Sequence, residues 1–152
     1  MSSEDGIPEV LSADVAALVD TGGFKFSVYL VRRDGETEHG KLALLGGRKD
    51  PADKGRILAT AKRETKEEGN IDVEEDTLEP LIVLDGHGRG DPRGVHRTSI
   101  VFATELLPHQ HRDARAGDGA SELLLIPLAN VPLDEMAFDH ARAILALRKK
   151  YG

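Results

Sequence analysis

Three glutamates on one side of a predicted helix constrain this chain more than any other sequence feature. Residues 56–68 have the composition of a helix, and Glu64, Glu67 and Glu68 are spaced i, i+3 and i+4 along it. At about 100° per residue these side chains share one narrow face, next to the apolar positions that should face a core. The helix must therefore place three carboxylates, the glutamate strip, at the edge of its buried face.

The glutamate strip has two interpretations. Like charges at i, i+4 cost a helix about 0.2–0.5 kcal/mol, and a hard divalent cation would offset this cost by binding carboxylate oxygens. Lys62 and Lys66 should point to the far side of the helix, so they leave the strip unneutralised. The alternative is a solvated acidic face, because glutamate is a good helix former and is common on protein surfaces.

The length and composition fit a single domain over residues 1–152. The 20 basic and 27 acidic residues give a net charge of −7, which argues against nucleic acid or a membrane surface as a partner. The chain has no cysteine, so disulfides, thiol catalysis and cysteine-based metal sites are excluded. Because no signal peptide or long apolar stretch is visible, we expect a cytoplasmic protein.

Local patterns predict strands alternating with helices. Residues 8–19 show helical spacing of apolar side chains, so 1–20 should be an N-terminal tail and helix. Gly69 and Asn70 can end the helix at 56–68. Further expected elements are strands at 24–31, 41–45, 77–84, 98–106 and 122–128, loops at 85–94 and 108–120, and a closing helix at 133–150. This mixture favours an α/β layer architecture.

The stretch from Gly46 to Ile71 resembles the Nudix box. That family pattern is G-x5-E-x7-R-E-U-x-E-E-x-G-U, where U is a bulky aliphatic residue. Residues 63–68 read R-E-T-K-E-E, so they retain the R-E-x-x-E-E core, and a double glycine precedes them. The resemblance implies a Nudix α/β/α sandwich with a central mixed sheet.

Several positions depart from the family pattern. Counted back from the arginine, Gly55 stands where the first glutamate is expected, and the loop is two residues longer than the pattern allows. Counted forward from the glycines, Asp53 falls on that position, where we expect an auxiliary role. Thr65 replaces the aliphatic residue, and Asn70 replaces the last glycine. The last change is mild because asparagine also accepts a left-handed conformation.

The resemblance implies a role for each matching residue. The three glutamates of the strip would be catalytic and would bind Mg²⁺ or Mn²⁺, with the Gly46 carbonyl as a further ligand. Gly47 and Arg63 would be structural parts of the box. Spacing alone also makes Arg63 and Glu67 an i, i+4 pair.

Three further segments resemble the ADP-ribose pyrophosphatases of this family. They are Asp-Pro-Arg-Gly at 91–94, Gly-Asp-Gly-Ala-Ser-Glu at 117–122 and Phe-Asp-His at 138–140. The resemblance implies a catalytic role for Glu122 and substrate contacts for Arg93 and Asp118. Arg32 and Arg33, at a strand end, are further substrate-binding candidates because a guanidinium suits phosphate. Surface arginines and solvated loop acids are the alternatives.

The resemblance also implies the reaction: metal-assisted hydrolysis of a nucleoside diphosphate linked to another moiety. We expect a small-molecule nucleotide substrate, with ADP-ribose giving AMP and ribose 5-phosphate; NDP-sugars and oxidised nucleotides stay open. Gly55 and the longer loop motivate a second hypothesis, a domain that senses ADP-ribose without cleaving it. The usual DNA-binding module of such regulators is not expected within 152 residues. Homodimers are common in this branch, and the N-terminal helix could serve one.

Overall fold

Strand β1 (Glu9–Asp20) is the axis of the fold, because neighbouring strands pair with both of its edges. One edge runs parallel to β6 (His96–Glu105). The other edge pairs antiparallel with β4 (Leu45–Arg48) in its middle and with β2 (Phe26–Arg33) at its end. This computed structural model describes residues 9–23, 25–85, 96–117 and 120–152.

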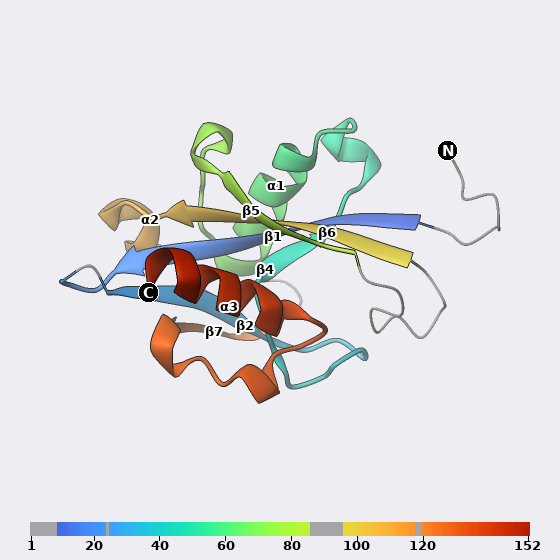
Figure 1. Ribbon diagram of the computed structural model, residues 1–152. Coiled ribbons are helices and arrows are strands. Elements are labelled where there is room, and N and C mark those ends of the chain that lie inside the picture. The colour runs from blue at the N-terminus through green and yellow to red at the C-terminus, as the bar shows by residue number, and fades with distance from the viewer. Residues whose placement is uncertain (1–8, 24, 86–95, 118–119) are drawn as a thin grey trace.

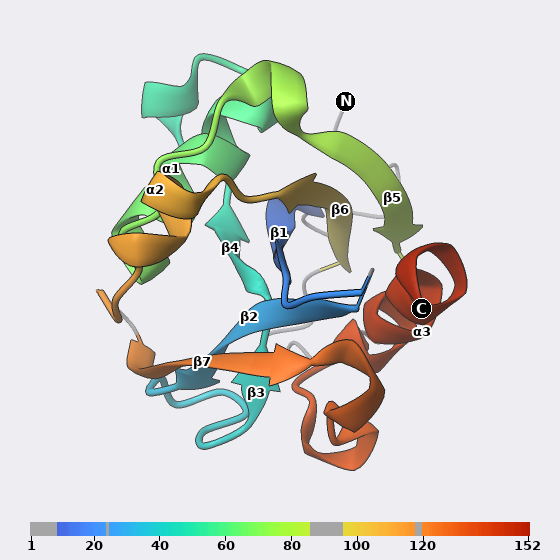
Figure 2. The ribbon, with the colours of Figure 1, turned by 90° about the vertical axis from the view of Figure 1, so that its left-hand side faces the viewer.

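The remaining strands complete a mixed seven-stranded sheet. The order is β3-β2-β1-β6-β5, with β4 on β1 and β7 on β2. These strands are β3 (Leu42–Ala43), β5 (Glu79–Leu84) and β7 (Ala120–Pro127). Along one edge of β1, pairing changes from β4 to β2. Strands β2, β3 and β7 therefore diverge from β1, β6 and β5 (Figure 2).

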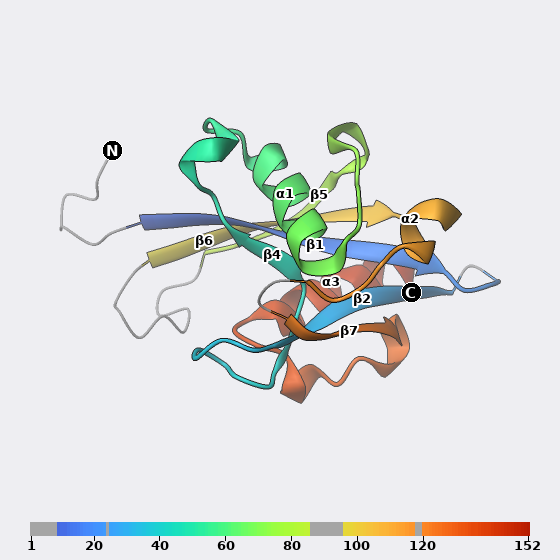
Figure 3. The same cartoon turned by 180° about the vertical axis from the view of Figure 1, so that it is seen from behind.

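Helices cover both faces of the sheet. Helix α1 (Ile57–Gly69) lies over β1 and β4, and α3 (His140–Tyr151) lies on the opposite side of β1 (Figures 1 and 3). A short helix, α2 (Pro108–Arg112), follows β6. This arrangement confirms the predicted α/β/α sandwich with a central mixed sheet. No helix in the described ranges has the length and apolar character needed to cross a membrane.

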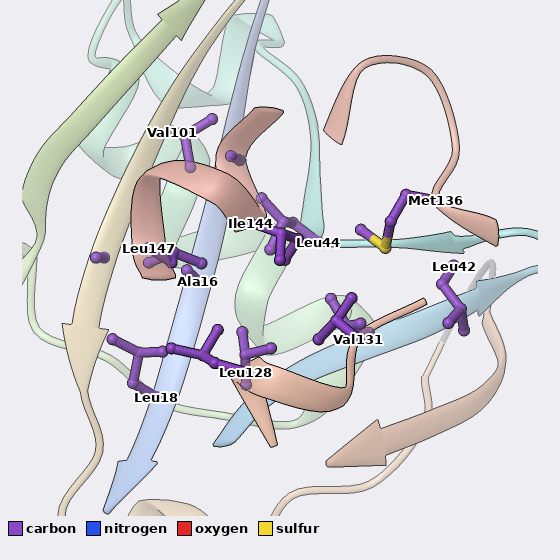
Figure 4. Packing of buried hydrophobic residues seen from close by; sticks show 14 of the residues in the cluster. Ala16, Leu18, Leu42, Leu44, Val101, Leu128, Val131, Met136, Ile144 and Leu147 are labelled. Atoms are coloured by element: carbon purple, nitrogen blue, oxygen red, sulfur yellow. The ribbon is translucent and has the colours of Figure 1, made fainter. Parts of the chain in front are cut away.

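The alternation of side chains along β1 divides the core into two layers. Ala13, Val15 and Ala17 are fully buried on the α1 side, whereas Ala16 and Leu18 are fully buried on the α3 side. Figure 4 shows the second layer, where side chains from α3 pack against the sheet. Since both layers are anchored on β1, this strand fixes where α1 and α3 lie relative to each other.

The predicted helix at 8–19 is wrong, because these residues form β1 from Glu9 onward. The strand is buried on both faces, so its apolar residues run almost continuously. A continuous apolar run cannot be distinguished from a buried helix by periodicity alone. The suggestion of an N-terminal helix that could serve a homodimer therefore loses its basis.

Other boundaries move by smaller amounts. The closing helix begins at His140 rather than 133, because Phe138 adopts a left-handed backbone conformation (φ 53°) that a helix cannot contain. The predicted loop at 108–120 contains α2 and the start of β7. Most of the expected glycine-rich loop lies outside the described residues. Short 3-10 turns occupy Pro51–Asp53, Glu75–Thr77, Leu128–Asn130 and Leu133–Glu135.

Candidate active site

Helix α1 carries the glutamate strip, as its spacing predicts. Thr65 is buried on the face toward the sheet, and Lys66 is exposed. The Glu64 side chain is 14% exposed and that of Glu67 is 47% exposed, so burial differs along the strip. The helix ends at Asn70, which adopts the left-handed cap conformation (φ 53°) expected of this position.

Two glycines bring the backbone of β4 against the strip. A Cβ at Gly47 would lie 2.5 Å from the Glu64 carboxyl carbon, and one at Gly46 would lie 2.3 Å from an oxygen of Asp14. A side chain at Gly46 would also clash with the Ala13 backbone oxygen, and one at Gly47 would displace the Glu64 carboxylate. The Gly46 amide donates a hydrogen bond of 2.8 Å to the Glu68 carboxylate. The double glycine thus seats β4 directly beside the carboxylates of α1.

Arg63 joins the loop before α1 to the strip. Its Nε and Nη2 atoms donate to the two carboxylate oxygens of Asp53 at 2.9 and 3.0 Å. Its Nη1 atom donates to Glu64 at 2.6 Å and to Glu67 at 3.3 Å. The predicted Arg63–Glu67 pair is confirmed, but it is the longest of these contacts. The shorter contacts orient Glu64 through Arg63.

Asp53 is a structural anchor of the loop. Its side chain is 3% exposed, and it accepts hydrogen bonds from Arg63, from the Thr60 hydroxyl at 2.7 Å and from the Asp50 amide at 3.0 Å. The hydrogen bonds from Arg63 hold the pKa of Asp53 far below its usual range, despite its burial. Both carboxylate oxygens of Asp53 accept hydrogen bonds, so this residue of the longer loop fixes Arg63.

Glu68 has the opposite electrostatic environment. Burial raises its pKa to about 8, and the nearby charges of Glu64 and Asp14 act in the same direction. The Gly46 amide and Arg33 only partly oppose this effect. Burial also raises the pKa of Glu64, although Arg63 counteracts it. Glu68 is thus a partly buried carboxylate whose charge the described residues do not neutralise.

The donors at this site suit a hard divalent cation. Carboxylates and backbone carbonyls are the ligands that Mg²⁺ and Mn²⁺ prefer, and no ion pair within the described ranges neutralises the carboxylate of Glu68. The fit is one of chemistry and not of a preformed cage. Within the described ranges, no three His, Asp or Glu side chains converge in a group that could hold a metal ion.

Asp14 lies beneath the double glycine, and the sequence analysis missed it. It faces Gly46 across the β1–β4 ladder and is 6% exposed. His140 Nε2 lies 3.5 Å from Asp14 Oδ2 without hydrogen-bond geometry, so this buried oxygen has no hydrogen-bond partner among the described residues. His140 Nδ1 accepts the Leu44 amide at 3.2 Å. A charged residue within the apolar run at 10–19 is the signal that could have revealed Asp14.

Arg33 is the predicted substrate-binding residue that the structure brings to this site. It is half-buried at the end of β2, and burial lowers its pKa. The charge of Glu68 raises its pKa, whereas the nearby Arg97 lowers it. Arg97, a residue of β6, is not among the residues predicted from the sequence. Arg33 is therefore close enough to both Glu68 and Arg97 to interact with them electrostatically.

Arg32 and Glu122 face each other on a different ladder. They are partners in the β2–β7 register and form an ion pair of 2.7 Å. Arg32 also donates to the Gly40 carbonyl at 3.0 Å. These contacts link neither residue to α1, so the catalytic role of Glu122 stays a prediction. The other two candidates, Arg93 and Asp118, lie outside the described residues.

A family model supplies the deciding comparison. The model of the NUDIX domain matches residues 9–147, nearly the whole chain. The chain belongs to the Nudix family. Nudix domains are generally pyrophosphohydrolases that use divalent metals, in agreement with the glutamate strip of α1. A search of curated proteins found no match.

Solved structures agree on the fold. The NUDIX domain of Shewanella oneidensis NrtR complexed with ADP ribose has a TM-score of 0.80 and 21% identity, covering 100% of this chain and 94% of that one. A mutT/nudix family protein from Listeria innocua has a TM-score of 0.74 and 27% identity, covering 94% of each chain.

Longer Nudix proteins match over part of their length. A bifunctional NMN adenylyltransferase/ADP ribose pyrophosphatase from Francisella tularensis, complexed with AMP and a Mn ion, has a TM-score of 0.78 and 22% identity. The match covers 96% of this chain but 43% of that one. This chain likewise spans 61% of a MutT/nudix family protein from Enterococcus faecalis, at 22% identity and a TM-score of 0.78.

Proposed function

We propose that this protein is a metal-dependent pyrophosphohydrolase that adds water to ADP-ribose and releases AMP and ribose 5-phosphate. The observation that carries the proposal is the Glu68 carboxylate, which the Gly46 amide holds beside Glu64 and which no described residue neutralises. The resemblance of the 91–94, 117–122 and 138–140 segments to ADP-ribose pyrophosphatases supports this substrate. The neighbouring structures that contain ADP-ribose or AMP support it as well.

In this proposal the glutamate strip and the Gly46 carbonyl hold Mg²⁺ or Mn²⁺. The bound metal would polarise a phosphoryl oxygen and help to ionise the attacking water. Arg63 keeps Glu64 oriented through its 2.6 Å contact, and the Gly46 amide does the same for Glu68. Arg33 supplies positive charge for the diphosphate on the β2 side, since a guanidinium can bind phosphate oxygens in pairs.

A substrate panel tests the proposal. ADP-ribose, an NDP-sugar, ATP and dGTP are each incubated with the protein and Mg²⁺ or Mn²⁺, and the products are separated by chromatography. We expect ADP-ribose to have the highest kcat/KM and to yield AMP. We also expect Arg93→Ala to raise KM for ADP-ribose without changing the metal requirement. Better hydrolysis of the triphosphates would reject ADP-ribose as the preferred substrate.

A domain that senses ADP-ribose without turnover is the second candidate. Two observations favour it: Asp53 is fully engaged with Arg63, and no three acidic or histidine side chains converge within the described ranges. One structural neighbour, NrtR of Shewanella oneidensis, has been solved complexed with a 27mer DNA. Calorimetry with ADP-ribose and Mg²⁺ separates the two candidates, because a sensor gives a binding isotherm without releasing AMP.

A further inference from the structure

Two non-glycine residues with left-handed backbones touch each other beside Arg33. Glu38, in the turn between β2 and β3, has φ 54°, and Phe138, ahead of α3, has φ 53°. Such a backbone is unusual for a bulky aromatic residue and persists only where its surroundings hold it. The Glu38 carboxylate accepts a hydrogen bond of 3.0 Å from the Phe138 amide. This contact, the Glu38–Phe138 clasp, ties the β2–β3 turn to the entry of α3.

The clasp presents an aromatic ring to Arg33. The Arg33 Cζ atom lies 4.7 Å from the centroid of the Phe138 ring, a cation–π distance. Arg33 Nε also donates to the Thr37 carbonyl at 2.9 Å, one residue before Glu38. Among the described residues, no hydrogen bond uses the Nη atoms of Arg33. The Phe138 ring thus holds one face of the guanidinium, and the Thr37 carbonyl holds its Nε edge.

The charges that act on Arg33 belong to the surroundings of the candidate site. Its electrostatic neighbours include Glu68 of α1, Asp14 of β1 and Arg97 of β6. Two of them lie at the double glycine, because Glu68 accepts the Gly46 amide and Asp14 pairs with Gly46. An arginine held in this place can meet an anion that reaches Glu68.

We propose that Glu38 and Phe138 are positioning residues that hold Arg33 ready to bind the diphosphate of the substrate. The inference rests on the proposed function for the presence of a diphosphate. A free arginine side chain loses much rotamer freedom when it binds phosphate, so ordering it beforehand strengthens binding. This role would explain Phe138, which the 138–140 motif alone left without a function.

Steady-state kinetics with a double-mutant cycle test the proposal. Arg33→Ala should raise KM for the diphosphate substrate by about 10–100-fold, since it removes a charged hydrogen-bond donor. Glu38→Ala and Phe138→Leu should each raise KM by about 3–10-fold and leave kcat within about twofold. Glu38→Gln should largely restore KM, because its amide oxygen can still accept from Phe138. Glu36→Ala, an exposed charge in the same turn, is the matched control and should change nothing.

The cycle separates positioning from general destabilisation. If Glu38 acts through Arg33, the double variant Glu38→Ala/Arg33→Ala should have the KM of Arg33→Ala alone. Independent, additive losses would overturn the proposal. So would an unchanged KM in Glu38→Ala and Phe138→Leu.

Two measurements without turnover keep this inference distinct from the proposed function. The ring of Phe138 should shift the NMR signal of the Arg33 Nε–H, which Arg33→Lys identifies by its disappearance. Glu38→Ala and Phe138→Leu should move this signal, and Glu36→Ala should not. Calorimetry with inorganic pyrophosphate should show weaker binding in the same two variants. A protein that cleaves no nucleoside diphosphate would refute the proposed function alone. An unmoved NMR signal or unchanged pyrophosphate binding would refute the positioning of Arg33 by Glu38 and Phe138.

Discussion

Asp53 is buried in the loop before α1 and Glu68 is partly buried on α1, but their electrostatic surroundings are opposite. Asp53 is held by two hydrogen bonds from Arg63, and its pKa is strongly lowered. Glu68 accepts one amide hydrogen bond, and its pKa is raised to about 8. The charge of Asp53 is thus compensated by neighbouring residues, whereas no residue in the described part of the chain compensates that of Glu68.

The difference separates a structural carboxylate from a functional one. Burying a charge is costly unless it is paired, and the fold supplies that pair for Asp53. For Glu68 the compensation must come from outside the described residues, and a divalent cation supplies it with the right chemistry. Perturbed carboxylates in such settings are candidates for function. The variants below test whether the two residues differ in this way.

The largest expected effect is on turnover at Glu68. Glu68→Gln should lower kcat by at least about 10²-fold, because losing a charged metal ligand forfeits several kcal/mol and each ~1.36 kcal/mol is tenfold. The Gly46 hydrogen bond should survive, since a glutamine oxygen also accepts, and the fold should be kept. Assays at saturating Mg²⁺ check this, with Glu74→Gln as a charge-matched control. Full activity in Glu68→Gln would remove this residue from the site.

Replacing Asp53 should affect stability more than activity, the opposite of what we expect for Glu68. Asp53→Ala leaves Arg63 without its main partner and should lower the free energy of unfolding by about 2 kcal/mol. The loss of kcat should stay below about tenfold, or roughly 1.4 kcal/mol, because Arg63 still contacts Glu64. Denaturant unfolding and kinetics measure both quantities. Asp50→Ala, which removes a more exposed and longer contact to Arg63, should cost much less, and equal losses in the two variants would contradict this assignment.

Local sequence predicts the helix that carries the site, but it does not predict which residues its side chains contact. The glutamate strip and the Asn70 cap depend on spacing within a few residues, so periodicity predicts them. Spacing also placed Asp53 at the altered box position, but it could not show that Arg63 takes up both of its oxygens. That partnership depends on the path of the longer loop.

Residues brought from distant elements escaped the sequence analysis. Asp14 was hidden because β1 is buried on both faces and its apolar run imitates a helix. The Glu38–Phe138 contact joins residues 100 positions apart, and no local pattern encodes such a pairing. The resemblance to ADP-ribose pyrophosphatases marked residues 138–140, but only the structure shows that Phe138 lies against Arg33.

The third prediction concerns how the stability of the Glu68→Gln variant depends on pH. A raised pKa means that the folded protein binds this proton more tightly than the unfolded chain. The associated stability is complete below about pH 4.3, and it is lost as the pH rises toward about 8. In EDTA at pH 8.5, Glu68→Gln should therefore be more stable than wild type by about 1 kcal/mol, or ~3 °C in Tm. Thermal unfolding at pH 5 and pH 8.5 tests this sign, and the difference should nearly vanish at pH 5. A wild type that is the more stable protein at pH 8.5 without metal would show that Glu68 is already compensated.

The smallest expected effect is at Lys66, whose charge lies near the strip in sequence but on the outer side of α1. Its side chain is exposed, so water screens its interaction with the carboxylates. Lys66→Ala should therefore leave kcat within about twofold, and removing a cation from the last helical turn should cost only about 0.3–0.5 kcal/mol of stability. We compare kcat and the free energy of unfolding of this variant with those of Glu68→Gln. A large loss of kcat in Glu68→Gln alone would show that position on the helix, and not net charge, decides which residue is needed for turnover. On the outer face of α1, Lys66 lines a polar groove shared with α2. A tenfold loss of kcat would mean that substrate reaches this groove and that the site extends around the helix.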